Sequence, residues 1–134
     1  EDTLELVPPH ENCVRLLASK GGQSAAKVDA QSLLEASLRM RPDRLLLGEL
    51  RGAETFTFLQ AINTGHPGSL TTVHANSPRA AYERLALMVM QSGVSLAKAD
   101  VLAYLEEVIP VVVQLGRENG QRVVSEILFA RNEG

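Results

Sequence analysis

The chain has 134 residues, of which 45% are hydrophobic and 22% charged, and its formal net charge is −3. This length and apolar content suit one modest domain, whose core must be aliphatic because tryptophan is absent. The charge gives no global basic field of the kind that binds nucleic acid. The single cysteine, Cys13, excludes an internal disulfide framework and a multi-cysteine zinc site. No apolar run approaches the roughly 20 residues that span a bilayer, so we expect neither a membrane helix nor a signal peptide.

The chain opens on an acidic segment, Glu1-Asp2-Thr3-Leu4-Glu5, with three carboxylates in five residues. Such a segment is either a solvated turn or a group that holds Mg²⁺ waters and serves as a general base. A short strand is predicted over residues 14–18, followed by a glycine-containing loop over 20–27. The loop does not match the phosphate-binding pattern G-x-x-x-x-G-K-[ST], which occurs nowhere in the chain.

The central feature is the stretch from Arg41 to Gly52, which contains three consecutive leucines at 45–47. A short apolar run of this kind predicts a buried parallel strand. Glu49 follows it, at the edge where open α/β sheets bind their ligands. Glu49 either holds a metal or its water, or is a surface glutamate at the end of a strand. Gly48 lacks a side chain beside this acid, so another group can approach the backbone closely.

Two histidines flank the next predicted strand, over residues 71–73, which is rich in β-branched side chains. His66 lies in a Gly-Pro-Gly loop before this strand, and His74 lies at its end. If the two strands are parallel, His74 shares a sheet edge with Glu49. A single histidine is more often a structural residue than a ligand, but His74 together with Glu49 favours a site.

The other predicted elements are mostly helices. Asp29 is the predicted N-cap of a helix that ends near Met40, before Pro42. A helix over 53–63 is expected to bury Phe56, Leu59 and Ile62. Ser77 as N-cap and Pro78 at the first position begin a helix to about Gln91, whose methionines serve either the core or a partner. A helix over 95–107 and two strands, 111–115 and 122–129, joined through Glu118-Asn119-Gly120, complete the chain. The order predicts an α/β fold with parallel strands in the middle and an antiparallel pair at the end.

On these residues the chain resembles the secretion ATPases of type IV secretion and conjugative transfer, relatives of those in type II secretion and pilus assembly. Residues 1–5 resemble the Asp box of that family, residues 41–52 its Walker B motif, and residues 64–76 its His box. The resemblance covers nearly the whole chain. It implies residues 1–134 as the C-terminal half of a RecA-like P-loop NTPase domain, with a central, mostly parallel sheet flanked by helices and a terminal antiparallel hairpin. The Walker A motif is absent. Gly48 stands where many other P-loop ATPases carry a Mg²⁺-binding aspartate, although Gly-Glu is usual in this family.

The resemblance also implies ATP and Mg²⁺ as cofactors and a role for each acid. Glu1, and also Glu5, would orient or deprotonate the attacking water. Asp2 would support the metal shell. Glu49 would hold Mg²⁺ through water or share the role of base.

For the histidines and arginines the resemblance implies contacts with nucleotide. His74 would sense or stabilise the γ-phosphate, and His66 would position its loop. Arg41 and Arg51, together with Arg39, are candidates to contact phosphate or a neighbouring subunit, because guanidinium groups stabilise the charge of phosphoryl transfer. For Arg39 a surface ion pair is the favoured interpretation.

The function that follows is an ATP-hydrolysing motor, a homohexamer in the cytoplasm at the inner membrane that energises macromolecule export, conjugative transfer or pilus assembly. Its partners would be the secretion or pilus machinery, and no direct, specific nucleic-acid binding is evident. The alternative is a non-catalytic half-domain that serves as an interaction module. Because the phosphate loop is missing, we expect this chain alone to lack ATPase activity. One cysteine argues against the type II branch, whose members carry a four-cysteine zinc insertion in this half.

Overall fold

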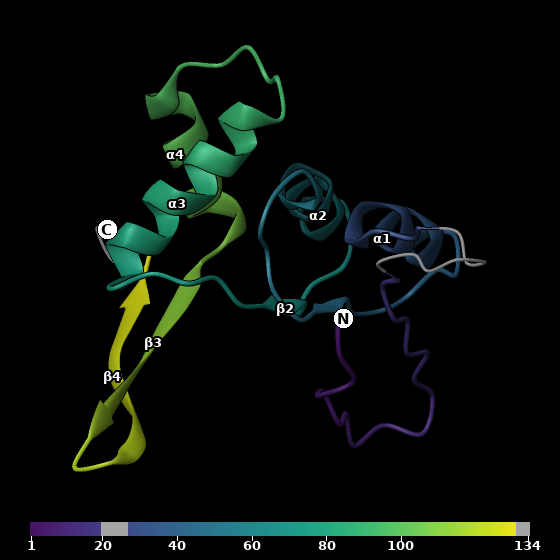
Figure 1. Cartoon of the computed structure of the whole chain (residues 1–134). Coiled ribbons are helices and arrows are strands. Elements are labelled where there is room, and N and C mark those ends of the chain that lie inside the picture. Colours follow the sequence, from purple (N-terminus) through teal and green to yellow (C-terminus); the bar gives the residue numbers. More distant parts are fainter. Residues whose placement is uncertain (20–26, 131–134) are drawn as a thin grey trace. The chain divides into compact units, whose positions relative to one another are not determined.

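The computed structural model describes residues 1–19 and 27–130, and the chain divides into two compact units, Glu1–Thr72 and Val73–Gly134. The first unit contains α1 (Ala30–Leu38), β1 (Leu46–Leu47), α2 (Glu54–Asn63) and β2 (Leu70–Thr71). The second contains α3 (Pro78–Gln91), α4 (Lys98–Val108), β3 (Val111–Glu118) and β4 (Gln121–Phe129). The described residues of each unit therefore form two helices and one pair of strands, which confirms an α/β fold (Figure 1).

The two strands of the first unit pair in parallel, as predicted. Leu46 is opposite Leu70 and Leu47 is opposite Thr71. The pairing extends beyond the strands, because the N–H of Leu50 donates to the carbonyl of Thr72 at 2.9 Å. The positions that follow β1 and β2 in this unit therefore lie at the same edge, where ligands bind in open α/β sheets.

The leucine run is less buried than the sequence predicted. Leu45 is buried, but the side chain of Leu46 is 41% exposed and Leu47 is half-buried. Successive side chains of a strand point to opposite faces. One face of the pair is therefore left open by the described residues of this unit, and the prediction of a fully buried strand is wrong at Leu46.

The short strand predicted over residues 14–18 is absent. In its place, the described residues show one isolated antiparallel bridge, in which Ser19 and Val28 exchange backbone hydrogen bonds of 2.8 and 3.1 Å. Val14 and Leu17 are exposed. A strand needs a neighbouring strand that pairs with it along its length, whereas this run pairs only with Glu1, through the carbonyl of Leu16 and the N–H of Ala18.

The helices of the first unit begin where their local signals predict. The carboxylate of Asp29 accepts the N–H of Ser32 at 2.9 Å and so caps α1, which ends before Pro42. The helix α2 packs against α1 (Figure 1), but its buried face differs from the predicted stripe. Leu59 is buried as expected, whereas Phe56 and Ile62 are half-buried. The buried positions of α2 are Glu54, Thr55, Phe58, Leu59 and Ala61.

In the second unit, α3 contacts α4 and both strands of the hairpin. Ser77 is its N-cap, as predicted, with its hydroxyl accepting the N–H of Ala80 at 3.1 Å, and Pro78 opens the helix. The helix α4 begins at Lys98, three residues later than predicted. The core of this unit consists of Ala81, Tyr82, Leu85, Ala86, Met88, Val89, Val101 and Leu105. The prediction of a purely aliphatic core is therefore wrong, because Tyr82 here and Phe58 in α2 are buried aromatic residues.

The hairpin forms around the predicted turn. Asn119 and Gly120 have φ angles of 49° and 80°, the left-handed conformation that Asn-Gly adopts readily at a two-residue hairpin turn. One face of the hairpin carries apolar side chains that remain exposed in the described structure, namely Val111, Val113, Leu115, Val124, Ile127 and Phe129.

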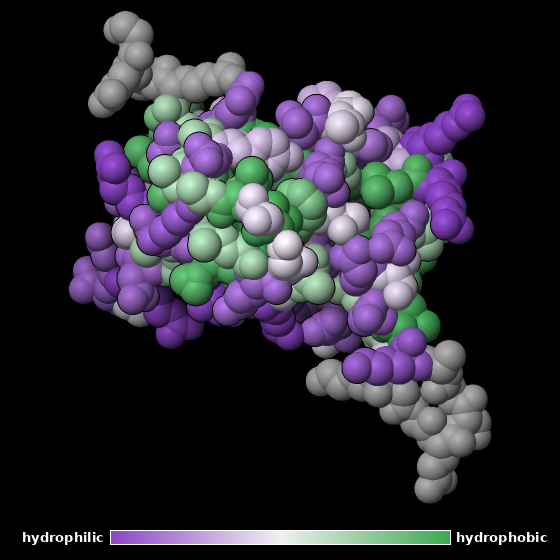
Figure 2. Space-filling model, turned by 90° about the horizontal axis from the view of Figure 1, so that it is seen from above, coloured by the Kyte–Doolittle hydropathy of each residue, from purple (hydrophilic) through white to green (hydrophobic). Residues whose placement is uncertain are grey.

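Apolar and hydrophilic residues are interspersed on the molecular face drawn in Figure 2. None of the described helices has the length and apolar character that crossing a membrane requires.

Candidate functional site

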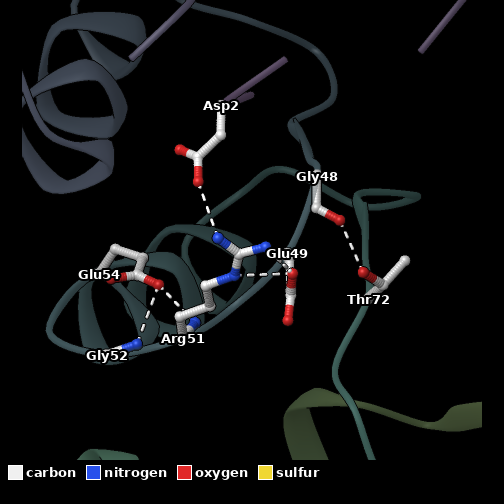
Figure 3. Close-up of polar contacts among 7 residues, drawn as sticks. All are labelled: Asp2, Gly48, Glu49, Arg51, Gly52, Glu54 and Thr72. Atoms are coloured by element: carbon white, nitrogen blue, oxygen red, sulfur yellow. Dashed lines mark hydrogen bonds and ion pairs between the residues drawn. The ribbon is translucent and has the colours of Figure 1, made fainter. Parts of the chain in front are cut away.

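The candidate site of the first unit is organised around the side chain of Arg51 (Figure 3). Its Nε and Nη2 atoms lie 2.7 and 2.5 Å from Oε2 of Glu49, and its Nη1 atom lies 2.8 Å from Oδ2 of Asp2. Asp2 and Arg51 are separated by 49 positions in the sequence. The guanidinium therefore joins an acid of the N-terminal segment to the acid that follows β1, and the first unit brings these two sequence-predicted residues together.

The guanidinium of Arg51 stays protonated in this environment. Hydrogen bonding to Glu49, followed by the negative charges of Glu49 and Asp2, raises the pKa of Arg51 above its already high ordinary value. The side chain of Glu49 is 18% exposed, whereas that of Asp2 is 48% exposed. Glu49 is thus the more enclosed of the two carboxylates, and Asp2 remains open to solvent and to a ligand.

Glu1 is held differently from Asp2, although both belong to the same acidic segment. Its Oε1 atom accepts the backbone N–H groups of Glu5 and Leu6 at 2.9 and 2.7 Å, and its Oε2 atom lies 3.8 Å from Arg15. Burial acts to raise the pKa of the Glu1 carboxyl, but the N–H groups of Leu6 and Glu5 and the nearby positive charges prevail and lower it. A lowered pKa makes a weaker base, so this geometry favours Glu1 as a fixed anion that shapes the turn. The side chain of Glu5 belongs to an exposed residue.

Gly48 allows the N-terminal segment to approach the backbone after β1. A Cβ atom at this position would lie 3.7 Å from Cγ of Glu1, which is an ordinary van der Waals contact. The group that approaches Gly48 is therefore Glu1, although alanine would also fit in this space. The carbonyl of Gly48 accepts the hydroxyl of Thr72 at 2.6 Å, which ties this segment to the end of β2 (Figure 3).

Glu54 is a part of this region that sequence reasoning missed. Its Oε1 atom accepts the backbone N–H of Arg51 at 2.6 Å and that of Gly52 at 3.0 Å (Figure 3). Glu54 is 8% exposed and lies in the first turn of α2. An acid in the first turn of a helix is favourable at the positive end of the helix dipole, but the N–H groups that Glu54 accepts precede the helix, and no local signal in the sequence predicts that contact. Glu54 thereby fixes the backbone from which the Arg51 side chain extends.

His66 is half-buried and connects two elements of the first unit. Its Nδ1 atom lies 2.8 Å from the carbonyl of Ala61, near the end of α2, an arrangement that suits a protonated Nδ1 acting as donor. The carbonyl of His66 accepts the hydroxyl of Ser69 at 2.8 Å, and the same hydroxyl accepts the N–H of Leu45 at 2.9 Å. His66 therefore holds the loop between α2 and β2 next to the start of the β1 region.

His74 belongs to the second unit, where it lies in the exposed segment that precedes α3. The neighbouring carbonyl of Ala75 accepts the side-chain N–H of Gln114 at 3.3 Å, which attaches this segment to β3. The prediction that His74 shares a sheet edge with Glu49 thus involves residues of two separate units and stays a prediction.

The two arginines before β1 differ in backbone conformation. Arg41 has a φ angle of 54°, a left-handed conformation that is uncommon for a residue other than glycine, and it is exposed. Strained positions of this kind occur often at functional sites, where the surrounding structure maintains them. Arg39 is the C-cap of α1, and its positive charge is favourable at the end of a helix. Because the N–H of Arg41 still bonds to the carbonyl of Leu38 just after α1, its left-handed backbone also suits the end of a helix, and its role in the site stays a prediction.

A resident metal cage is not present among residues 1–19 and 27–130, where no group of three or more His, Cys, Asp or Glu side chains is placed to hold a metal ion. Mg²⁺ in nucleotide sites, however, is usually held by one or two carboxylates together with the phosphates of the substrate. Asp2 and Glu49 supply hard carboxylate oxygens and are brought together through Arg51. The expectation that Asp2 and Glu49 hold magnesium together with nucleotide stays a prediction.

The sequence matches the family described as "Type II/IV secretion system protein" over residues 1–128. The chain belongs to this family. The predicted resemblance to secretion ATPases is therefore confirmed, and the Arg51 cluster and the His66 loop are features of a type II/IV secretion system protein.

Named relatives place the chain among type IV secretion proteins. It is 47% identical, over 96% of its length, to the type IV secretion system protein VirB11 of Bartonella quintana. It is 46% identical, over 90% of its length, to the type IV secretion system protein PtlH of Bordetella pertussis. The chain spans 37% of the length of each of these two relatives.

A solved structure confirms the fold. The VirB11 ATPase of the Brucella suis type IV secretion system, crystallised in complex with sulphate, superimposes with a TM-score of 0.71 at 40% sequence identity. The match covers 76% of this chain and 32% of the Brucella chain. The matched part of this chain therefore shares its fold with the VirB11 ATPase of Brucella suis.

Proposed function

We propose that this chain is the part of a secretion ATPase that carries the Asp box, residues 1–5, the Walker B motif, residues 41–52, and the His box, residues 64–76. The observation that carries the proposal is the contact of Arg51 with both Asp2 and Glu49. Two motifs that lie far apart in the sequence thereby meet at the edge beyond β1. The relatives named VirB11 and the VirB11 ATPase structure support nucleotide hydrolysis by the complete protein.

The acids divide into two roles in this proposal. Glu49 would orient the attacking water or hold Mg²⁺ through water, and Asp2 would support the metal shell. Glu1 and Glu5 would assist with the water, and Glu1 also keeps the turn in shape through the N–H groups of Glu5 and Leu6. Magnesium supplies Lewis-acid stabilisation of the phosphates when it is bound.

The histidines and arginines act on the nucleotide or on its loops. His74 contacts the γ-phosphate, and His66 positions its loop through the carbonyl of Ala61. Arg41 and Arg51 contact phosphate or a neighbouring subunit. The left-handed backbone of Arg41 supports its inclusion, because the fold maintains an uncommon conformation there.

For the complete protein we propose a homohexameric ring in the cytoplasm at the inner membrane, where ATP hydrolysis drives type IV secretion, conjugative transfer or pilus assembly together with the rest of that machinery. Sedimentation of the full-length protein with a non-hydrolysable ATP analogue measures the assembly. A strict monomer at micromolar concentration contradicts the ring.

This chain alone lacks the Walker A motif and with it the lysine and the backbone N–H groups that hold the phosphates. We therefore expect it to release no phosphate from Mg²⁺–ATP.

The decisive experiment is Glu49→Gln in the full-length protein. Glutamine keeps the shape of the side chain and removes its negative charge, so nucleotide binding should survive while turnover falls by at least about 100-fold. The matched control is Glu83→Gln, at an exposed residue of α3 that pairs with Lys98. A folded Glu49→Gln enzyme with wild-type turnover refutes the assignment of Glu49.

His74→Ala tests the second unit independently. A histidine that contacts the γ-phosphate makes a contact with ATP that ADP cannot make. Its loss should therefore narrow the difference between the affinities for ATP and ADP. ATP and ADP affinities and the melting temperature are measured together. If the affinity ratio is unchanged and the melting temperature falls, His74 is a structural residue.

A further inference from the structure

The N-terminal acidic segment owes its position to polar contacts more than to burial. Residues Asp2 to Glu5 are all exposed, so no apolar packing holds the carboxylate of Asp2 in place. Glu1 is anchored through its carbonyl, which accepts the N–H of Ala18 at 2.8 Å. The side chain of Asp2, in contrast, contacts Arg51 at 2.8 Å. Arg51 is thus the link between Asp2 and the region after β1.

Two contacts other than that with Asp2 hold Arg51 in place. Its backbone N–H is held by the buried carboxylate of Glu54 at 2.6 Å. Its guanidinium is held by Glu49, which engages both Nε and Nη2. This use of two nitrogens on one carboxylate sets the direction of the planar group, and it leaves Nη1 pointing at Asp2 (Figure 3).

The charges explain why a cation is needed at this place. Asp2 and Glu49 both present carboxylates to the same guanidinium, and without a positive group between them they would repel each other. Mg²⁺ would meet this need when nucleotide is bound, since it prefers the same oxygen ligands. In the absence of nucleotide, Arg51 supplies the positive charge.

We propose that Arg51 is a positioning residue of the site: without nucleotide, its guanidinium bridges Glu49 and Asp2 and so holds the acidic segment against the end of β1. The inference rests on the proposed function for its catalytic meaning, since it concerns the acids assigned there to metal and water. The bridge keeps both acids together before the metal arrives. It differs from a contact between Arg51 and phosphate, because it operates in the nucleotide-free protein.

The first test is hydrogen exchange of the full-length, nucleotide-free protein, followed by mass spectrometry of the peptide that contains residues 1–6. The N–H groups of Glu5 and Leu6 report on the turn, because Glu1 holds both. Arg51→Met should speed their exchange about 1.5-fold to fivefold, the range expected for losing exposed ion pairs. Arg51→Lys should restore part of the protection, since lysine keeps the charge but not the planar fork. Arg84→Met, at an exposed position of α3, is the matched control and should leave this peptide unchanged.

The second test asks whether Arg51 acts through Asp2. In an Asp2→Ala background, Arg51→Met should add little further exchange, because each change removes the contact between Asp2 and Arg51. In ATP hydrolysis, Arg51→Met should lower kcat by about tenfold, with partial recovery in Arg51→Lys, because misplaced groups slow the chemical step.

Two outcomes overturn the inference. One is exchange at residues 1–6 that stays at the wild-type rate in a folded Arg51→Met protein. The other is full additivity of Asp2→Ala and Arg51→Met. A wild-type protein that hydrolyses no ATP refutes the proposed function instead, and the exchange measurements still decide whether Arg51 holds the acidic segment.

Discussion

Replacement of Glu54 by alanine provides a sharp test of how the segment after β1 is held. The change removes the acceptor of two backbone N–H groups, those of Arg51 and Gly52, at 2.6 and 3.0 Å. A hydrogen bond to a charged group contributes about 1.5–3 kcal/mol when it is buried. Glu54 is buried, but Gly52 is half-buried and Arg51 exposed, so water can replace part of the loss. We expect Glu54→Ala to lower the free energy of unfolding by about 2–3 kcal/mol in total.

Glu54→Gln distinguishes the contribution of the negative charge to stability from that of the hydrogen-bond acceptor. Its side-chain carbonyl can still accept both N–H groups, so the cost should be about half that of alanine. The measurement is urea unfolding of each purified variant, followed by circular dichroism. The matched control is Glu83→Ala, which removes an ion pair whose two side chains are both 52% exposed and should change stability by less than about 1 kcal/mol.

The result that refutes this reasoning is a Glu54→Ala protein that unfolds at the same urea concentration as Glu83→Ala. The N–H groups of Arg51 and Gly52 would then be satisfied without Glu54. A second consequence follows for the site, because Glu54 fixes the backbone that carries Arg51. In the full-length protein, Glu54→Ala should therefore also speed exchange in residues 1–6, whereas Glu83→Ala should not.

Two further predictions concern the second unit. Ser77→Ala removes the hydroxyl that caps α3 and should cost about 1 kcal/mol, measured by thermal unfolding, with Ser92→Ala at the other end of the helix as the comparison. Tyr82→Phe leaves the carbonyl of Ile109 without its 2.5 Å donor and should cost about 1–2 kcal/mol at neutral pH. Burial, followed by the charge of Glu106, raises the pKa of Tyr82 above its ordinary value of 10.0. The stabilisation that comes from keeping the Tyr82 hydroxyl protonated is therefore complete below pH 10 and is lost as the pH rises through the higher pKa of the folded protein. Tyr82→Phe should abolish this loss of stability at alkaline pH.

Several features were determined by the sequence itself, because their causes lie within a few residues. The caps Asp29 and Ser77 use side chains that accept N–H groups three residues ahead. The Asn119-Gly120 turn uses left-handed backbone angles that these residues tolerate. Each of the three motifs is likewise a short stretch of sequence. The match to the secretion family over residues 1–128 confirms the recognition that rested on these motifs.

Tertiary structure decided the features that depend on residues distant in the chain. The run at 14–18 has the composition of a strand but no partner strand in the described structure, and Leu46 lies on a face that the described part of its unit leaves open. The buried side of α2 depends on where that helix meets α1, so Phe58 is buried and Phe56 is not. Asp2 and Arg51 meet across 49 positions, and no local pattern encodes such a distance. Propensities and caps act over one turn, whereas burial and ion pairing depend on which surfaces the folded chain brings into contact.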